Sequence, residues 1–364
     1  MKAYIVEREA VSHNIRKILD HAAGVPVWAV LKGDGYGLGC GPMARLCREN
    51  GLGRFAGTEP AEAEAIRAEG LEEAEILMLR ATTDREEVER LLDLGCILTL
   101  SSPADGAVIR AAAEEKGVCA RVHLKLDTGM GRYGFLPAEE AAIRQTLDAL
   151  GEMVQVTGVY THFHSSFGKE EITRRQFAAF QNACDRLEAA GYALGERHCC
   201  NSSAFLRFKD MHLGGVRLGS ALLGRVAVRD PLGLKRVGYA EASVEELRLL
   251  PKGHTVGYGA ATTLKRDTRS AVIPIGYYHG FTLQRGRDVW RAQDCIRGIL
   301  SNLKLLLKPS APTVTVGGRS TRTLGHIGMF HTCVDVTDLT CELGDLVRVE
   351  INPLLMKGLP VVYR

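Results

Sequence analysis

The sequence has no apolar run that approaches the roughly 20 residues a helix needs to cross a bilayer. Its N-terminal stretch, MKAYIVEREAVSHNIRK, is too polar for a secretory signal peptide. The chain also has little excess charge, because 46 basic and 43 acidic residues give a formal net charge of only +3. A charge this small does not indicate nucleic acid or a charged membrane as a partner. We therefore expect a cytoplasmic protein that binds neither.

Paired cysteine spacing is missing as well. The ten cysteines are scattered, and the adjacent pair Cys199 and Cys200 suits neither a zinc site nor a bridge between the two. In a cytoplasmic protein they are expected to be reduced core residues, with no metal site. The 364 residues are 46% apolar and 24% charged, which is ordinary for a globular protein of one large domain or two.

Short apolar runs alternate with helical stretches in the first part of the chain. Many of the helical stretches open on Pro, Asp or Ser and close on Gly. Eight such runs are the count for a closed (β/α)₈ barrel, which we place at residues 7–226. A doubly wound open sheet is the alternative, but it more often has fewer strands, and no GxGxxG follows the first run. The eight runs are 25–31, 54–57, 75–79, 96–100, 120–126, 154–163, 196–200 and 214–218.

The pattern changes after residue 226. Short runs rich in Val, Ile and Thr are separated by glycine, mostly without helices between them, so residues 227–364, together with 1–6, are predicted to form a β-rich domain. One stretch, at about 294–308, is apolar at helical spacing and basic elsewhere. We expect an inserted amphipathic helix that packs on the β-rich domain, in preference to a membrane role.

The most informative motif is WAVLKGDGYGLG, in which four apolar residues lead into Lys32 and a glycine-rich loop. A lone lysine after a strand is most often solvated. An amine held at the mouth of a core, however, loses its proton through desolvation and attacks carbonyls. Other polar residues follow the later strands of the predicted barrel, at the face where barrel enzymes carry their chemistry. They are Tyr36, Lys125, Asp127, Arg132, His162, His198, Asn201, Ser202, Ser203, Arg217, Gly219 and Ser220.

The loops after the seventh and eighth strands are the usual phosphate site of such barrels. Asn201, Ser202 and Ser203 offer side-chain oxygens at a helix N-terminus, and Gly219 and Ser220 offer backbone N–H groups. A phosphate site beside a nucleophilic lysine suggests pyridoxal 5′-phosphate bound to Lys32 as a Schiff base.

The motif around Lys32 resembles the lysine-anchoring signature of the alanine racemase family, and further blocks follow in the family's order over essentially the whole chain. The resemblance implies an isomerase that makes D-alanine, a peptidoglycan precursor, as a homodimer with shared active sites. The further blocks are KLDTGMGRYGF, YTHFHS, HCCNSS, VRLGSALLG, VGYGA, IPIGYYHG, LGHIGM and LPVVYR.

The resemblance also implies two catalytic bases. Lys32 is one, and Tyr258, supplied by the other subunit, is the second base on the opposite face of the substrate. Two such bases are what racemisation requires. A tyrosine titrates near 10, so His162 and Arg217 are expected to stabilise its phenolate as nearby cations.

The remaining roles are implied by the same matching. Arg217 faces the pyridine nitrogen, where related decarboxylases carry a carboxylate, and so favours a racemase. The lysine matching Lys125 is carbamylated in many members and orients the arginine matching Arg132. The cofactor and substrate contacts implied are Tyr36, His162, Asn201, Ser202, Gly219 and Ser220 for pyridoxal phosphate, His198 supporting Arg217, and Arg132, Tyr277 and the N–H of Met329 for the substrate.

Four positions depart from the family pattern. His279 stands at a usually acidic position, Phe330 replaces a polar residue, Leu283 matches an entrance arginine, and Lys357 matches a phosphate-binding tyrosine. We expect an altered substrate entrance with the catalytic pair intact. Alanine is the leading substrate, another small amino acid such as serine is the second, and a pyridoxal phosphate carrier without turnover is the third.

Overall fold

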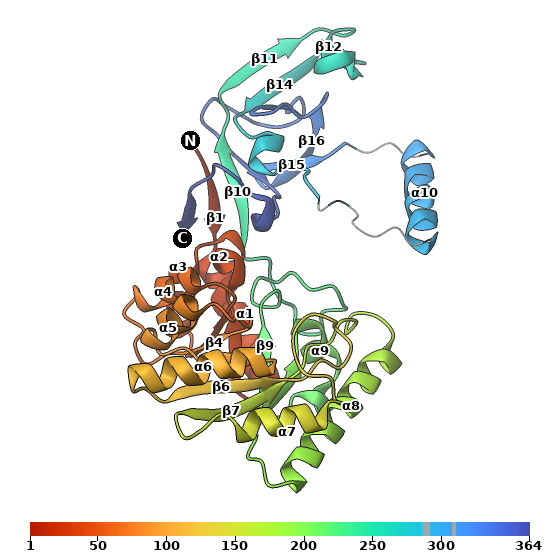
Figure 1. Ribbon diagram of the computed structural model, residues 1–364. Coiled ribbons are helices and arrows are strands. Elements are labelled where there is room, and N and C mark those ends of the chain that lie inside the picture. Colours follow the sequence, from red (N-terminus) through yellow and green to blue (C-terminus); the bar gives the residue numbers. More distant parts are fainter. Residues whose placement is uncertain (285, 287–291, 308–310) are drawn as a thin grey trace. The chain divides into compact units, whose positions relative to one another are not determined.

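The computed structural model describes residues 1–284, 286, 292–307 and 311–364. The chain divides into two compact units, Arg8–Val237 and Met1–Glu7 with Gly238–Arg364 (Figure 1). Between the last strand of the first unit and the first strand that follows it, residues 219–237 form turns and irregular chain. No helix in the described part of the chain is long and apolar enough to span a membrane.

The first unit contains all eight predicted strands, and every pairing between neighbours is parallel. A parallel bridge between Leu77 and Ile97 joins the two ends of the sheet, with the N–H of Met78 donating to the carbonyl of Ile97 at 2.8 Å. The sheet therefore closes into the predicted barrel, and the open-sheet alternative is excluded. The strands are β2 (Val27–Val30), β3 (Arg54–Gly57), β4 (Glu75–Met78), β5 (Leu98–Leu100), β6 (Ala120–Lys125), β7 (Val154–Tyr160), β8 (Glu196–Cys200) and β9 (Gly215–Leu218).

Each predicted helical stretch of this unit contains a helix, and local chemistry sets the ends of some of them. α6 (Pro103–Lys116) follows Ser102, whose side chain accepts from the N–H of Asp105, and it ends at Gly117, which has φ 63°. The helices are α1 (Arg8–Ala22), α2 (Lys32–Gly37), α3 (Cys40–Glu49), α4 (Pro60–Arg67), α5 (Arg85–Asp93), α6 (Pro103–Lys116), α7 (Glu140–Asp148), α8 (Glu170–Ala189), α9 (Ser202–Arg207) and the short η1 (Lys209–Met211).

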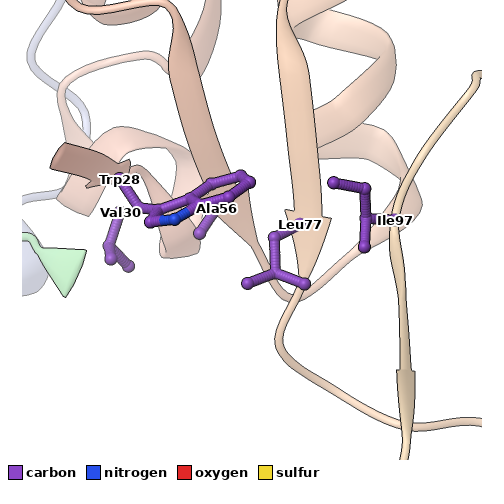
Figure 2. Close-up of a cluster of buried hydrophobic side chains, with 5 residues drawn as sticks. All are labelled: Trp28, Val30, Ala56, Leu77 and Ile97. Carbon is purple, nitrogen blue, oxygen red and sulfur yellow. The ribbon is translucent and has the colours of Figure 1, made fainter. Parts of the chain in front are cut away.

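A cluster of buried side chains from neighbouring strands fills part of the barrel (Figure 2). Trp28 and Val30 are two apart on β2 and so point to the same face of the sheet. They pack with Ala56 of β3, Leu77 of β4 and Ile97 before β5, and all five are 6% exposed or less. Because this apolar layer fills the inside of the barrel, the residues that follow these strands lie at the end of a packed core.

The second unit is β-rich, as predicted, with a nine-stranded sheet in the order β11-β14-β17-β16-β15-β18-β10-β1-β19 and a separate β12-β13 pair. The run EASVEELRLL is divided between β10 and β11. The N-terminal strand pairs antiparallel with β10 and parallel with β19. The strands are β1 (Lys2–Val6), β10 (Gly238–Ser243), β11 (Glu246–Leu250), β12 (Thr255–Val256), β13 (Thr262–Thr263), β14 (Thr268–Ile273), β15 (Thr313–Val316), β16 (Arg319–Leu324), β17 (Thr332–Asp335), β18 (Leu346–Val349) and β19 (Val361–Tyr363).

The described part of the predicted stretch forms a helix, α10 (Ala292–Leu307), and residue 308 of that stretch lies outside the described residues. Its packing on the β-rich domain stays a prediction. A 3.6-residue period specifies a helix with an apolar face but not what covers that face. The exposed apolar side chains of α10 are Ile296, Ile299, Leu300, Leu303, Leu305, Leu306 and Leu307.

Candidate active site

Lys32 stands at the carboxyl end of β2, where the backbone makes a left-handed turn along α2. Gly33, Asp34, Gly35 and Tyr36 have φ of 66°, 52°, 63° and 58°. Glycine adopts this region freely, but a residue with a side chain pays about 1–2 kcal/mol there. Asp34 and Tyr36 both do so, which means that the surrounding contacts must hold this turn in place.

The carboxylate of Glu62, on α4, supplies those contacts. One of its oxygens accepts from the backbone N–H of Gly33 and, at 3.4 Å, from that of Asp34. The other accepts from the N–H groups of Thr58 at 2.7 Å and Glu59 at 3.1 Å. One buried side chain therefore joins the turn after β2 to the loop after β3. The sequence analysis missed this residue, since an acidic residue in a first helical turn is usually only a cap.

The amine of Lys32 is poised for chemistry. Burial and the charge of Arg132 lower the pKa of Lys32, and the charge of Glu62 opposes them by raising it. A lowered pKa leaves more of the amine neutral near pH 7, which is the nucleophilic form.

Tyr36, at the end of the same turn, lies against the loop after β9. A Cβ added to Gly219 would come within 2.1 Å of the Tyr36 hydroxyl, so a side chain at that position would displace Tyr36. The Ser202 hydroxyl accepts from the N–H of Gly219 at 3.3 Å and that of Ala221 at 3.2 Å. Two hydroxyl groups and close backbone N–H groups thus gather beside Lys32's turn, as a phosphate site requires. Burial and Glu62 raise the pKa of Tyr36 to about 12, so its hydroxyl keeps its proton.

Asn201 lies beside this cluster, but its side chain is engaged locally. It caps α9 by accepting from the N–H of Ala204 at 3.1 Å, accepts from the Ser166 hydroxyl at 2.7 Å, and donates to the carbonyl of Phe163 at 3.1 Å. Ser220 is half-buried. The structure therefore gives Asn201 a role in shaping the loop, and its direct contact with a cofactor stays a prediction.

Arg217 on β9 is buried inside the barrel and fully engaged. Its guanidinium donates to Nδ1 of His198 at 2.6 Å and to the carbonyl of Thr161 at 2.6 Å. It also lies over the Tyr160 ring, 4.9 Å from the centroid. These contacts fix both the position and the orientation of the guanidinium, and they place His198 as its partner.

Lys125, at the end of β6, is a second buried amine. Burial and the charges of Arg217 and Arg132 lower its pKa to about 7. The following loop is held by Asp127, whose carboxylate accepts from the N–H groups of Gly129, Met130 and Arg132. A pKa of about 7 leaves roughly half of the amine neutral near pH 7, and the neutral amine is the form that reacts with carbon dioxide.

Arg132 is exposed on that loop and lines a cavity of about 470 Å³. The loops after β4, β5 and β6 form its walls, with Thr82, Ser101 and Tyr133 among the lining residues. The cavity is of the size that takes small molecules, and an arginine at its edge suits a carboxylate.

His162, after β7, differs from its predicted role. Burial and the charges of Arg217, Lys125, Arg132 and Lys32 lower its pKa well below the usual value. These surroundings favour the neutral ring near pH 7 and disfavour the cationic role expected for it. The arginines supply the positive charge of this end of the barrel.

The other predicted residues lie in the β-rich unit. Tyr258 begins the short helix η2 (Tyr258–Ala260) and is 82% exposed. Tyr277 begins η3 (Tyr277–His279), and its N–H donates to the carbonyl of Gly328 at 3.1 Å. The N–H of Tyr278 donates to the carbonyl of Met329 at 3.0 Å, so Tyr277 and Met329 lie on adjoining loops.

The departures from the family pattern gather around these loops. His279 is only 1% exposed, and its ring contacts the amine of Lys2 at 3.0 Å and the N–H of Gly276 at 3.1 Å. Its place is inside the domain, so it does not line an open entrance as expected. Phe330 is exposed and packs on Tyr278, whose ring also lies 5.2 Å from the amine of Lys357. Leu283 is exposed as well.

Comparison with known families gives matches along most of the chain. The model of the alanine racemase N-terminal domain matches residues 6–226, and that of the alanine racemase C-terminal domain matches residues 237–352. Alanine racemase 1 of Oceanobacillus iheyensis is 31% identical over 355 residues, covering 94% of this chain and 87% of the relative.

Solved structures agree. The alanine racemase of the D-cycloserine producing Streptomyces lavendulae has a TM-score of 0.83 at 26% identity, over 100% of this chain and 97% of that one. The alanine racemase of Bartonella henselae with covalently bound pyridoxal phosphate shares the fold, with a TM-score of 0.80 at 22% identity over 100% and 99% of the two chains. The chain is thus an amino-acid racemase, and it belongs to the alanine racemase family.

Proposed function

We propose that the protein interconverts L- and D-alanine with pyridoxal 5′-phosphate as its cofactor, and that Lys32 and Tyr258 of a second subunit are the two bases. The observation that carries the proposal is the position of Lys32. Its partly desolvated amine ends a barrel strand, and the same turn brings Tyr36 against Gly219 and Ser202.

The residues around that turn fit the cofactor. The glycine at 219 leaves space beside the Tyr36 hydroxyl that any side chain would fill, and Ser202 adds a second hydroxyl. Tyr36, Ser202, Gly219 and Ser220 would hold the phosphate, and Lys32 would carry the covalent attachment. The Bartonella henselae relative, described with covalently bound pyridoxal phosphate, supports this assignment. When bound, the cofactor withdraws electrons from the Cα of an attached amino acid and so acidifies its proton.

Arg217 would face the ring nitrogen of the cofactor. Burial lowers the pKa of Arg217, but a guanidinium still keeps its proton near pH 7 in a protein. It therefore donates a hydrogen bond without protonating the ring, which limits the electron withdrawal and favours return of the proton to Cα over other outcomes. The buried bonds of Arg217 to His198 and Thr161 would hold it for this role.

The substrate carboxylate would be held by Arg132 and by the N–H of Met329, with Tyr277 beside it. The lowered pKa of Lys125 supports its carbamylation, which would place a negative charge at the end of β6 and orient Arg132. Lys125 would then act on the substrate only through that arginine.

Lys32 would take the Cα proton from one face, and Tyr258 would return a proton to the other. Exposure of Tyr258 at 82% in the single chain supports its contribution to the site of a partner subunit. The positive charges of Arg132 and Arg217 would stabilise the phenolate, while His162, being neutral, would act as a hydrogen-bonding group.

The test is proton exchange at Cα in heavy water, started from each enantiomer of a panel of amino acids. Exchange and racemisation fastest with alanine are expected. A clear preference for serine or another small amino acid would replace alanine as the substrate, and Phe330 would then be the first position to examine. Retention of cofactor without any exchange would make the chain a carrier rather than a racemase.

A further inference from the structure

A second histidine lies behind His198, and the sequence analysis did not identify it. Nδ1 of His123, on β6, is 2.8 Å from Nε2 of His198, and Nδ1 of His198 is 2.6 Å from the guanidinium of Arg217. The three side chains are 2%, 0% and 3% exposed. They form one hydrogen-bonded chain inside the barrel, which ends at the arginine of the proposed active site.

The direction of each hydrogen bond in this chain follows from Arg217. A guanidinium has only donors, so Nδ1 of His198 must accept and carries no proton. The single ring proton of His198 then lies on Nε2, which faces His123. Nδ1 of His123 must therefore accept, and both imidazoles are neutral, each with its proton on Nε2.

The electrostatic surroundings agree with neutral rings. Burial and the charges of Arg217, Arg54 and Arg121 lower the pKa of His123 to about 3. Burial and the charges of Arg217, His123 and Arg54 lower the pKa of His198 well below its usual value. Protonation of either ring would also place two donors face to face in the chain.

The barrel is locally irregular at both histidines. The pairing of β6 with β7 shifts register between Val122 and His123, and that of β8 with β9 shifts between His198 and Cys200. Such bulges re-aim side chains. A Cβ on Gly158 would lie 2.6 Å from the His123 ring, so the opposing strand must have glycine there.

Aromatic rings enclose the pair. Tyr160 stacks on His198 at 5.0 Å between centroids, and Trp28 meets the edge of His123 at 5.8 Å. The rings exclude water from the two hydrogen bonds and restrict the imidazoles to this geometry.

We propose that His123 is a positioning residue for the reaction: it accepts the only ring proton of His198 and thereby fixes His198 as the acceptor that holds Arg217 at the active site. The effect on the reaction rests on the proposed role of Arg217, whereas the hydrogen-bond chain is independent of that role. The simpler alternative is that His123 only fills space in the barrel. The two differ because only the positioning role requires the ring proton of His198 to lie on Nε2.

The first test uses the wild-type holoenzyme with ¹⁵N-labelled histidine. Side-chain spectra between about pH 5.5 and 9 should show His123 and His198 both neutral, both protonated on Nε2, and neither titrating. An Nδ1-protonated ring at either position, or titration of either ring in this range, overturns the proposal. Because this measurement does not need activity, it tests the hydrogen-bond chain even if no amino acid is racemised.

The second test compares variants of position 123. His123→Leu removes the acceptor, and we expect kcat to fall by about 10–100-fold with a smaller change in KM, as when the partner of an oriented functional side chain is lost. His123→Asn offers an amide oxygen near the place of Nδ1 and should recover most of kcat and keep the His198 proton on Nε2.

The matched control is His212→Leu, since His212 is also a buried histidine of this unit, 3.0 Å from the carbonyl of Phe205. Its kcat should stay at the wild-type value. Equal kcat in His123→Leu and wild type, with an unchanged His198 signal, contradicts a positioning role. If His123→Leu does not fold, the His198 signal of His123→Asn decides instead. A His198 proton on Nδ1 in that variant contradicts a positioning role.

Discussion

The carboxylate of Glu62 accepts the backbone N–H of Gly33, the residue that follows Lys32. A side chain of α4 thus holds the strained left-handed turn that presents the reactive amine. The same carboxylate caps its own helix through the N–H of Glu59, so structural and functional roles meet in one group.

Glu62→Gln is expected to lower the free energy of unfolding by about 1–3 kcal/mol, because an amide accepts on one side only and leaves buried N–H groups unpaired. It also removes a charge that raises the pKa of Lys32. In cofactor-free protein, the pH at which Lys32 becomes reactive toward an acylating reagent, followed by mass spectrometry, should therefore shift downward.

The control for this variant is Asp105→Asn. Asp105 is another buried acidic residue in a first helical turn, that of α6, and it accepts from the N–H groups of Ser101 and Ser102, which precede the helix. We expect a similar loss in the free energy of unfolding, with no change in the pH at which Lys32 becomes reactive. If both variants shift the Lys32 profile equally, the specific link between Glu62 and the turn is wrong.

Gly219→Ala should displace Tyr36, because the new methyl group would lie 2.1 Å from the phenol oxygen. We expect a loss of about 1–3 kcal/mol in stability from overpacking and a marked loss of affinity for pyridoxal phosphate. Denaturation and cofactor titration measure the two effects separately, and unchanged affinity in the single variant would count against this phosphate site.

Lys125→Met tests the buried amine through pH. An unfolded lysine keeps its proton to about pH 10.5, whereas Lys125 in the fold releases it above about pH 7. Between these values the unfolded chain binds one more proton, so wild-type stability rises with pH in this window. In bicarbonate-free buffer the variant should have a higher melting temperature than wild type near pH 7. The difference in melting temperature should become smaller toward pH 10. If the difference in melting temperature between the variant and wild type were the same at all pH values, the lowered pKa of Lys125 would be contradicted.

Lys32→Ala should lose both covalent cofactor and racemisation. Tyr258→Phe should keep the cofactor but lose racemisation by about 10²–10⁴-fold, the range for a general acid or base. Absorbance of the bound cofactor and Cα exchange from each enantiomer distinguish the two losses. Full activity of Tyr258→Phe would remove the tyrosine from the mechanism.

The barrel could be predicted because each strand is a short apolar run bounded by helix stops and starts. The β-rich unit was predicted less completely. Only Val244 and Glu245 separate β10 from β11 in the sequence, which gives little sign of a boundary. The partners of β1, which include β10, lie more than 200 residues away. Pairing at that distance has no local signal.

The residues of the candidate site could likewise be predicted only in part. Lys32, Arg217 and Gly219 stand at strand ends and in glycine loops, where sequence patterns are readable. His123 lies within the apolar run of β6 and Glu62 in the first turn of a helix, where the ordinary readings are core filling and capping. Because their partners come from other strands and loops, their roles can be identified only in the folded structure. The protonation of His162 likewise depends on charges from several strands.

The most direct test of the central claim, an active site that joins Lys32 of one subunit to Tyr258 of another, is to mix the two inactive variants. Lys32→Ala and Tyr258→Phe chains are combined in equal amounts, dissociated and reassociated, and Cα exchange with alanine is measured. Half of randomly formed dimers contain one chain of each kind, and each of these has one complete site, so about a quarter of wild-type activity should return. If the mixture stays as inactive as its components although mixed dimers form, the two residues do not act across subunits and the account is contradicted.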